Sequence, residues 1–225
     1  MPALTVVESD VNFYDEKEIK VTVRISDYIH GVTQSALAPW ADLTPWALVS
    51  DAPERVRELL RQLPDEHYQV SGDIAVHRTA QVEEGAILKG PLIIGPDCFI
   101  AAGAYLRGGC WLDEHCIIGP GAELKSSFVF AGSKLAHFNF VGDSVLGAGV
   151  NLEAGSLIAN YRNERADKTV NVRIGDGLVS TGCEKFGALL GDGARLGANA
   201  VVAPGGLLRP GTVIRRLALY DCEEV

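Results

Sequence analysis

Apolar residues recur at every sixth position from about Val76 onward. Ten consecutive members of this series are apolar, namely Val76, Val82, Leu88, Ile94, Ile100, Leu106, Leu112, Ile118, Leu124 and Phe130. For the first eight of these residues, the residue four positions later is Ala or Cys in seven cases, namely Ala80, Ala86, Cys98, Ala104, Cys110, Cys116 and Ala122. In the remaining case it is Leu92. Helices repeat about every 3.6 residues and strands every two, so neither explains this pattern. It predicts a β-helix, in which each hexad forms one flat face and one corner of a stacked coil.

The six-residue repeat is interrupted twice. After Phe130 it resumes through Leu146, Leu152 and Ile158, and later through Leu190, Leu196, Val202, Leu208 and Ile214. The step from Phe130 to Leu146 is four residues longer than two hexads, which predicts a four-residue bulge containing His137. The polar stretch 161–185 predicts a loop excursion with a strand over Thr169–Ile174. Long ordered loops on a rigid scaffold often carry function.

Residues 1–70 lack the six-residue repeat. Two alternating stretches, Thr5–Phe13 and Ile19–Ile25, predict short strands. Asp51 followed by Glu54 matches a capping box. An amphipathic helix over 52–63 is predicted by apolar residues at helical spacing, namely Val56, Leu59, Leu60 and Leu63. Its apolar stripe needs a partner, and we expect it to cover the open N-terminal end of the β-helix.

Length and charge limit the possible classes of protein. The 225 residues fit a small α/β cap over 1–70, a β-helix over 71–216 and a C-terminal tail over 217–225. A net charge of −9 argues against a broad nucleic-acid surface. No apolar stretch approaches the roughly 20 residues that span a bilayer, and no signal peptide is visible. We therefore expect a cytoplasmic protein without membrane or nucleic-acid partners.

The five cysteines do not suggest a metal site. Cys98, Cys110 and Cys116 occupy the small position of the repeat, where a free thiol behaves as a small apolar residue. No CxxC pair or close Cys/His group is present in the sequence. We expect buried free thiols in a reducing compartment and no metal requirement.

Two cations in the repeat are candidates for anion binding. Arg107 and Lys125 are 18 residues apart, which is three hexads. If three hexads close one coil, the two stack on adjacent coils roughly 4.8 Å apart. An anion between them would remove the repulsion of like charges in register. The alternative is two solvated cations that point apart. Glu123 flanks inward Leu124 together with Lys125, so both point outward on one face.

His137 is a candidate general base, because histidine accepts protons near neutral pH. The alternative is an exposed loop histidine without a chemical role. Asn151, Asn160 and Tyr161 follow on polar positions and are further candidates, although Asn also commonly stabilises turns.

The run 122–161 resembles the acetyltransferase domain of the bifunctional N-acetylglucosamine-1-phosphate uridylyltransferase/glucosamine-1-phosphate acetyltransferase family. Five paired elements occur in the family's order, namely Glu123/Lys125, Lys134/His137, Gly142/Asp143, Asn151/Ala154/Gly155 and Asn160/Tyr161. The later segment 181–205 is similar to archaeal-type members. Residues 1–70 are too short to be the family's nucleotidyltransferase domain.

The resemblance implies a left-handed parallel β-helix that forms homotrimers with sites at subunit boundaries. It implies acetyl transfer from acetyl-CoA to the amine of an amino-sugar 1-phosphate, without a metal. His137 would then be the general base, with Glu123 and Asn160 orienting the imidazole or polarising the thioester. The substrate site would comprise Arg107 and Lys125 at the phosphate together with Phe140, Asn151 and Tyr161, whereas Ala154, Ala198 and the Tyr161 backbone would lie along acetyl-CoA.

The chain departs from the family pattern in ways that leave the acceptor open. Phe140 stands where the family has a sugar-contacting Tyr, and either Arg165 or Lys168 would replace the family's loop lysine. Two alternatives follow: an acyltransferase with another acceptor, such as a nucleotide-linked sugar, or another acyl donor, and a non-catalytic trimeric scaffold that partners a nucleotidyltransferase. The C-terminal cations Arg209, Arg215 and Arg216 would either contact the CoA phosphates or form a solvated edge.

Overall fold

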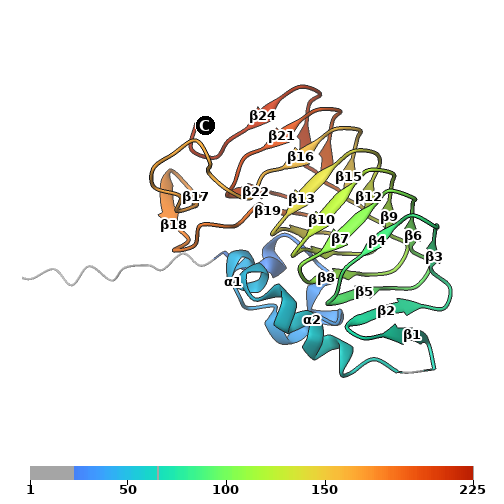
Figure 1. The fold of residues 1–225 in the computed structure, drawn as a ribbon. Coiled ribbons are helices and arrows are strands. Elements are labelled where there is room, and N and C mark those ends of the chain that lie inside the picture. The colour runs from blue at the N-terminus through green and yellow to red at the C-terminus, as the bar shows by residue number, and fades with distance from the viewer. Residues whose placement is uncertain (1–22, 65, 225) are drawn as a thin grey trace, which may run out of the picture.

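The chain winds into stacked coils whose strands form three parallel sheets (Figure 1). The computed structural model describes residues 23–64 and 66–224. Sheet A contains eight strands, namely β1 (Tyr68–Ser71), β2 (Ile74–His77), β5 (Leu92–Ile94), β8 (Cys110–Leu112), β11 (Phe128–Val129), β14 (Val145–Leu146), β19 (Ala188–Leu190) and β22 (Gly206–Leu208). Only β1 is antiparallel to its neighbour in this sheet.

The other two sheets complete each coil. Sheet B contains β3 (Gln81–Val82), β6 (Phe99–Ile100), β9 (Ile117–Ile118), β12 (Lys134–Leu135), β15 (Asn151–Leu152), β20 (Arg195–Leu196) and β23 (Val213–Ile214). Sheet C contains β4 (Ile87–Leu88), β7 (Tyr105–Arg107), β10 (Glu123–Lys125), β13 (Phe140–Gly142), β16 (Leu157–Ile158), β21 (Val201–Val202) and β24 (Leu219–Tyr220). The predicted parallel β-helix is confirmed. We call the outer sides of these sheets face A, face B and face C.

The interior is a stack of apolar side chains in register. On sheet A, for example, Ile94 pairs with Leu112, and Leu112 pairs with Val129. All three are fully buried, and each such side chain contributes roughly 1.5–3 kcal/mol by leaving water. Most of the predicted small positions are also buried, whereas Ala80 and Ala86 in the first coil are partly buried, and burial raises the pKa of the Cys110 thiol to about 11. Cys98, Cys110 and Cys116 are therefore core residues, as expected.

The predicted four-residue bulge is wrong. Val129, and not Phe130, faces the interior and is followed at six-residue steps by Leu135 and Val141. The steps from Leu124 to Val129 and from Val141 to Leu146 are each one residue short of a hexad. Two corners have therefore each lost one residue, and His137 lies at a regular corner. Phe130 points outward and packs edge-on against Trp111, with ring centroids 5.4 Å apart.

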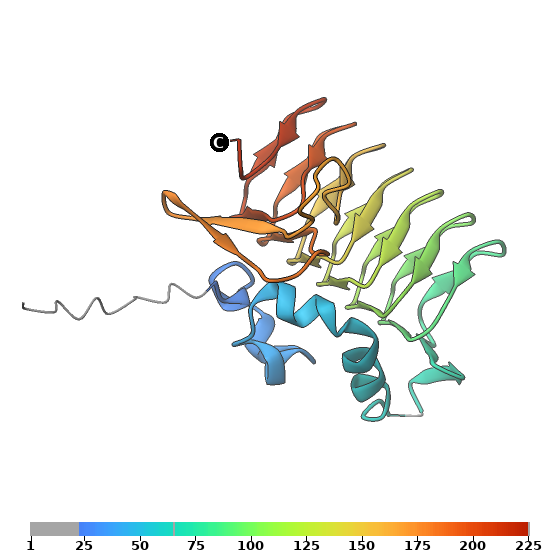
Figure 2. The same cartoon turned by 60° about the vertical axis from the view of Figure 1, so that its left-hand side comes forward.

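The N-terminal segment covers a side of the β-helix and not its open end. It comprises three 3-10 helices, η1 (Ile25–Asp27), η2 (Val32–Gln34) and η3 (Ala38–Trp40), followed by α1 (Pro45–Ser50) and α2 (Ala52–Leu60). Figure 2 shows these helices alongside the coils. Their apolar residues pack on the outward side chains of face A, namely Ile93, Trp111, Phe128, Val145 and Leu189. The expected end-capping role is therefore corrected, because the exposed apolar surface lies along face A.

Local details of this segment differ from the sequence prediction. Thr44 caps α1 by accepting the Ala47 N–H at 3.4 Å. Asp51 precedes α2, but its carboxylate makes no capping hydrogen bond and lies 3.8 Å from the Arg55 guanidinium. The predicted helix over 52–63 ends at Leu60. The predicted strand Thr5–Phe13 and most of Ile19–Ile25 lie outside the described residues, and Ile25 itself begins η1.

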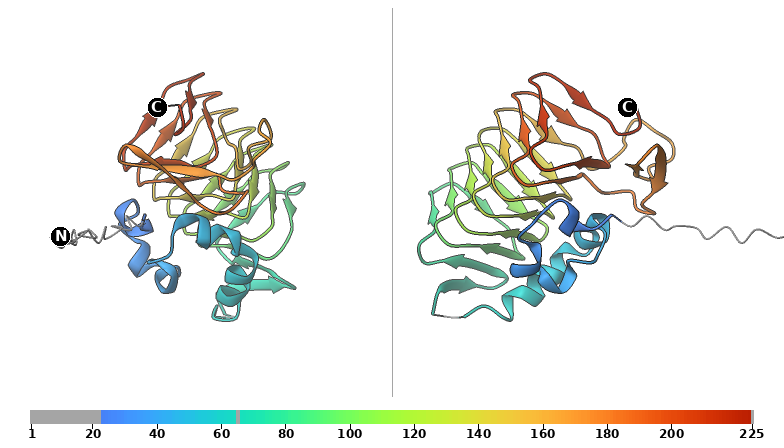
Figure 3. Two further views of the ribbon diagram at one scale, coloured as in Figure 1. Left: turned by 90° about the vertical axis from the view of Figure 1, so that its left-hand side faces the viewer. Right: turned by 180° about the vertical axis from the view of Figure 1, so that it is seen from behind.

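The excursion after β16 forms a hairpin that covers the rest of face A. Its strands β17 (Asn171–Ile174) and β18 (Gly177–Ser180) are antiparallel (Figure 3). The predicted strand Thr169–Ile174 contains β17, whereas β18 was not predicted. Phe186, at the end of the excursion, is buried edge-on against Trp46 at 5.9 Å. Face A is thus covered by the chain itself, while faces B and C remain open. Within the described residues, no helix combines the length and apolarity needed to cross a membrane.

Candidate functional site

Three cations stack on successive coils of face C. Lys125 on β10 pairs directly with Arg107 on β7. Lys89 follows Leu88, which pairs with Leu106, so it lies opposite Arg107. The predicted register of Arg107 and Lys125 is confirmed. Lys89 was missed, although it precedes Arg107 by the same 18 residues that separate Arg107 from Lys125.

Two of these cations are paired with carboxylates. Arg107 donates to Glu123 Oε1 from Nε at 2.8 Å, and its Nη2 lies 2.7 Å from the same oxygen. Lys125 Nζ donates to both oxygens of Asp143, at 2.9 and 2.7 Å. These carboxylates already relieve the repulsion between the two cations, so an anion is not required for that purpose, and the phosphate site stays a prediction. Lys89 has no salt bridge to a described residue, and its ammonium lies 5.2 Å from the centroid of the Tyr105 ring.

Asp143 and Asn160 form the corner where face C meets face A. Asn160 Nδ2 donates to the Asp143 carboxylate, and the Asn160 carbonyl accepts the Phe186 N–H at 3.2 Å. Gly142 leaves the space for this contact, because a Cβ there would lie 2.7 Å from Asn160 Nδ2. Asp143 was not predicted to have a role, although the Gly142/Asp143 pair belongs to the motif. The corner therefore links Lys125 to the start of the excursion.

His137 occupies the edge between faces B and C. Its carbonyl accepts the Gly155 N–H at 2.9 Å, the Ala154 carbonyl accepts the Asn199 N–H at 3.0 Å, and the Ala198 carbonyl accepts the Leu217 N–H at 3.0 Å. His137, Ala154, Ala198 and Arg216 therefore hold equivalent positions on successive coils of this edge. The His137 side chain is exposed, and no described residue forms a hydrogen bond with its ring. Its role as a base stays a prediction.

An arginine-rich groove of about 520 Å³ lies on face B beside this edge. Arg216 binds the Glu153 carboxylate at 2.7 and 2.8 Å, and Glu153 also accepts the Ala198 N–H at 2.9 Å. These bonds lower the pKa of Glu153, the Arg216 hydrogen bond contributing most. Arg195 and Arg215 line the groove without a salt bridge to any residue in 23–64 or 66–224.

Other candidate residues lie elsewhere. Asn151 lines the same groove on face B, so it does not share a face with Arg107 and Lys125. Phe140 is on face C, where it pairs with Glu123. Arg209 is directed to the N-terminal segment, with its guanidinium 5.9 Å from the centre of the Tyr28 ring.

Both candidates for the loop cation lie in the excursion. The Lys168 ammonium is 5.4 Å from the centroid of the Tyr161 ring. Arg165 instead donates to Glu223 Oε2 at 2.7 Å. Lys168 is therefore the cation beside Tyr161, and Arg165 is engaged by the C-terminal segment.

One chain thus divides the predicted site residues between two places. Face C and its corner bring together Arg107, Glu123, Lys125, Phe140 and Asn160. The edge with face B carries His137, Ala154 and Ala198, with Asn151 beside them. Among the residues that the structure describes, no three His, Cys, Asp or Glu side chains are grouped as metal ligands.

Comparison with known proteins agrees with the repeat. Residues 91–126 match a family model described as bacterial transferase hexapeptide (six repeats). The chain is 39% identical over 100 residues to a bifunctional sugar-1-phosphate nucleotidylyltransferase/acetyltransferase of Sulfurisphaera tokodaii, with 42% of this chain and 24% of the relative covered. It is 30% identical over 142 residues to the uncharacterized acetyltransferase YaiX of Escherichia coli, with 63% and 61% covered.

These relatives are matched over only part of their length. The chain spans about a quarter of the S. tokodaii protein and about three fifths of YaiX. Among solved structures, the acetyltransferase domain of PglB from Neisseria gonorrhoeae is similar at 15% identity and a TM-score of 0.32, over 84% of this chain and 70% of that one. Residues 91–126 thus match the hexapeptide-repeat model, and the chain is similar to curated acetyltransferases over the parts that align.

Proposed function

We propose that the protein is an acetyl-CoA-dependent acyltransferase that acetylates the amine of an amino-sugar 1-phosphate. The observation that carries this proposal is the edge column of His137, Ala154 and Ala198, which leads from a candidate base to the arginine groove. The curated relatives named as acetyltransferases support the reaction class.

Acetyl-CoA fits the edge column in shape and charge. Its extended arm would follow the small residues Ala154 and Ala198, which leave the edge unobstructed. Its phosphates would reach Arg195 and Arg215, because guanidinium groups bind phosphate oxygens through paired hydrogen bonds. The thioester would then lie at the His137 end of the column.

The acceptor fits face C. Arg107 and Lys125 would bind the sugar phosphate, with Glu123 and Asp143 holding both cations in place. Because Phe140 offers no hydroxyl group, the site has one hydrogen-bonding group fewer for a sugar hydroxyl. Discrimination among sugars that differ at that hydroxyl is correspondingly weaker.

In the proposed reaction the acceptor nitrogen forms a bond to the thioester carbonyl carbon, and His137 takes the proton that the nitrogen loses. The carbon–sulfur bond then breaks, and the proton on His137 passes to the departing CoA thiolate. Asn160 and backbone N–H groups would stabilise the negative charge on the carbonyl oxygen. Binding both substrates at one edge raises the rate by proximity.

We further propose a homotrimer, because one chain divides its site residues between faces B and C. Contact between face B of one copy and face C of another would bring His137 and Asn151 toward the cations of the neighbour. Two large apolar side chains on the shared edge support such a contact, since Phe138 is 72% exposed and Leu217 is 79% exposed.

A nucleotide-linked amino sugar is a second candidate acceptor, and Lys89 favours it. The third cation extends the stack one coil beyond Arg107, and it has no carboxylate partner in the described part of the chain. A diphosphate group would use this additional charge, whereas a single phosphate needs only Arg107 and Lys125.

The test is release of free CoA thiol from acetyl-CoA with a panel of amino-sugar 1-phosphates and their nucleotide-linked forms. We expect release with at least one acceptor, and a loss of roughly 10²–10⁴-fold in kcat for His137→Ala. His115→Ala is the matched control, because His115 is an exposed corner histidine away from the edge column. No release with any acceptor, with no protection of the fold by CoA, would favour the scaffold alternative.

A further inference from the structure

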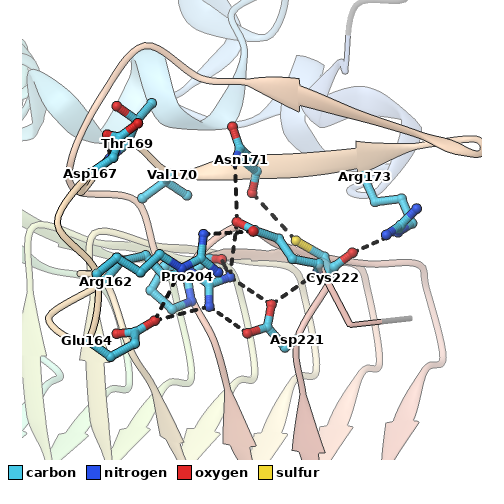
Figure 4. A network of polar contacts seen from close by, with 12 residues as sticks. Arg162, Glu164, Asp167, Thr169, Val170, Asn171, Arg173, Pro204, Asp221 and Cys222 are labelled. Atoms are coloured by element: carbon cyan, nitrogen blue, oxygen red, sulfur yellow. Dashed lines mark hydrogen bonds and ion pairs between the residues drawn. The ribbon is translucent and has the colours of Figure 1, made fainter.

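Arg162 is a buried cation at the base of the excursion. Its side chain is 2% exposed, and its two terminal nitrogens bind the two oxygens of Asp221 at 2.5 and 2.7 Å (Figure 4). Nη2 also donates to the Pro204 carbonyl at 2.9 Å. This paired arrangement fixes both the position and the plane of the guanidinium group.

The same C-terminal segment holds the rest of the excursion. Arg173 Nε donates to the Cys222 carbonyl at 2.7 Å, and Arg165 donates to Glu223 at 2.7 Å. Asn171 Nδ2 lies 3.4 Å from the other Glu223 oxygen. With the Asp221 contacts included, residues 221–223 therefore bind four separate points of an excursion that departs from the coil more than 50 residues earlier.

Arg162 directly follows two residues of the proposed site. Asn160 and Tyr161 lie between β16, which is the coil strand directly before the excursion, and the buried guanidinium. On one side Asn160 is fixed by Asp143. On the other side, the backbone is restrained by the buried Arg162 side chain, which is bound to Asp221. The position of Tyr161 is therefore determined between these two anchors.

We propose that Arg162 is a positioning residue, which together with Asp221 holds Asn160 and Tyr161 in place for the acceptor. The inference rests on the proposed function for its catalytic part, but the anchoring itself is independent of it. Loss of the Asp221 charge would remove the two shortest contacts of the buried guanidinium and leave as charge partners only Glu223 at 3.5 Å and the exposed Glu164 at 3.6 Å, which is unfavourable enough to displace the segment. Asn160 and Tyr161 would then move with it.

The test compares Asp221→Asn with Glu224→Gln. The first keeps the shape of the side chain and removes the charge that Arg162 binds. The control removes a charge three residues away, where Glu224 is exposed. Asp221→Glu is a second variant, which retains the charge and should restore part of the effect.

Two measurements report anchoring without any activity. Hydrogen exchange followed by mass spectrometry gives the protection of the peptides that cover 160–174. Labelling of Cys222, located by peptide mass spectrometry, reports opening of the segment, because this thiol is 1% exposed. We expect Asp221→Asn to accelerate both processes while exchange in the coil strands stays unchanged, and Glu224→Gln to behave as the parent protein.

Steady-state kinetics then test positioning. We expect Asp221→Asn to lower kcat/KM for the acceptor roughly 10- to 100-fold, with KM for acetyl-CoA unchanged. Unchanged exchange and labelling would overturn the anchoring. Faster exchange with unchanged acceptor kinetics would overturn the positioning role. If the parent protein transfers no acetyl group at all, the proposed function fails, and the exchange data still decide the anchoring.

Discussion

Asp143 binds the Lys125 ammonium through both carboxylate oxygens, at 2.9 and 2.7 Å, and accepts the Asn160 amide as well. One carboxylate thus holds both a cation of face C and an amide at the corner where face C meets face A. The Asp143 side chain is only 8% exposed, so water cannot easily replace either contact.

Asp143→Ala should therefore affect both stability and acceptor binding. Removing the carboxylate leaves Lys125 and Asn160 without their shared partner, which should cost about 1–3 kcal/mol of unfolding free energy. Urea unfolding measures this loss, and KM for the acceptor should rise in parallel. Asp176→Ala is the control, since Asp176 is exposed and makes no salt bridge to a described residue. An unchanged unfolding curve for Asp143→Ala would contradict the prediction.

Lys89→Ala distinguishes the two acceptor classes. If the acceptor carries a diphosphate group, removal of the third cation should raise its KM about 10-fold, the effect of one lost charge-assisted hydrogen bond. A sugar 1-phosphate should be bound as before. Arg61→Ala, directly after α2, removes a distant exposed cation for comparison. If Lys89→Ala changes KM for neither acceptor, a role for Lys89 is excluded.

The arginine groove predicts a specific loss of CoA affinity. Removing both Arg195 and Arg215 by substitution with Ala should raise KM for acetyl-CoA by about 10- to 100-fold and weaken its dependence on salt. Acetyl-pantetheine lacks the nucleotide phosphates, so its KM should not change. Arg209→Ala is the control, because that guanidinium lies over Tyr28 and outside the groove. A parallel loss for both thioesters would place the phosphates elsewhere.

Asp221 predicts a defined response to acid. The Arg162 hydrogen bonds lower the pKa of Asp221 below its usual value. Its stabilising effect is therefore fully present above the unfolded-state pKa of about 3.9 and is lost as the pH falls through the lower folded-state pKa.

The difference in unfolding free energy between the parent protein and Asp221→Asn measures this effect. We expect a constant difference from pH 5 to 7 that shrinks below about pH 4. Glu224→Gln should show no such difference at any pH. A difference that grows toward acid would contradict the assigned ion pair.

The six-residue spacing was sufficient to predict the coil, and the 18-residue spacing was sufficient to predict that Arg107 lies beside Lys125. The sequence pattern failed where the coil lost one residue at a corner. Phe130 is as apolar as Val129 and lies six residues after Leu124, so the spacing predicted that Phe130 faces the interior. Hydrophobic spacing alone does not distinguish an inward side chain from an outward one that another segment covers.

The pairing of Asp143 with Lys125 and the burial of Arg162 could not be predicted for another reason. Arg162 and Asp221 are 59 positions apart, and their spacing follows no repeat because the excursion interrupts the coil between them. Asp143 follows Lys125 by 18 residues, but the shortened coil pairs Lys125 with Gly142 and places Asp143 at the corner. Only the folded chain shows which carboxylate neutralises which cation.

The covering of face A limits how copies of this chain can assemble. With that face occupied by the chain's own helices and hairpin, a contact between copies would join face B of one to face C of another. Such head-to-tail contacts either close into a ring or continue as a filament, depending on the rotation from one copy to the next. The angle between face B and face C of one copy would then determine the number of subunits in a closed ring.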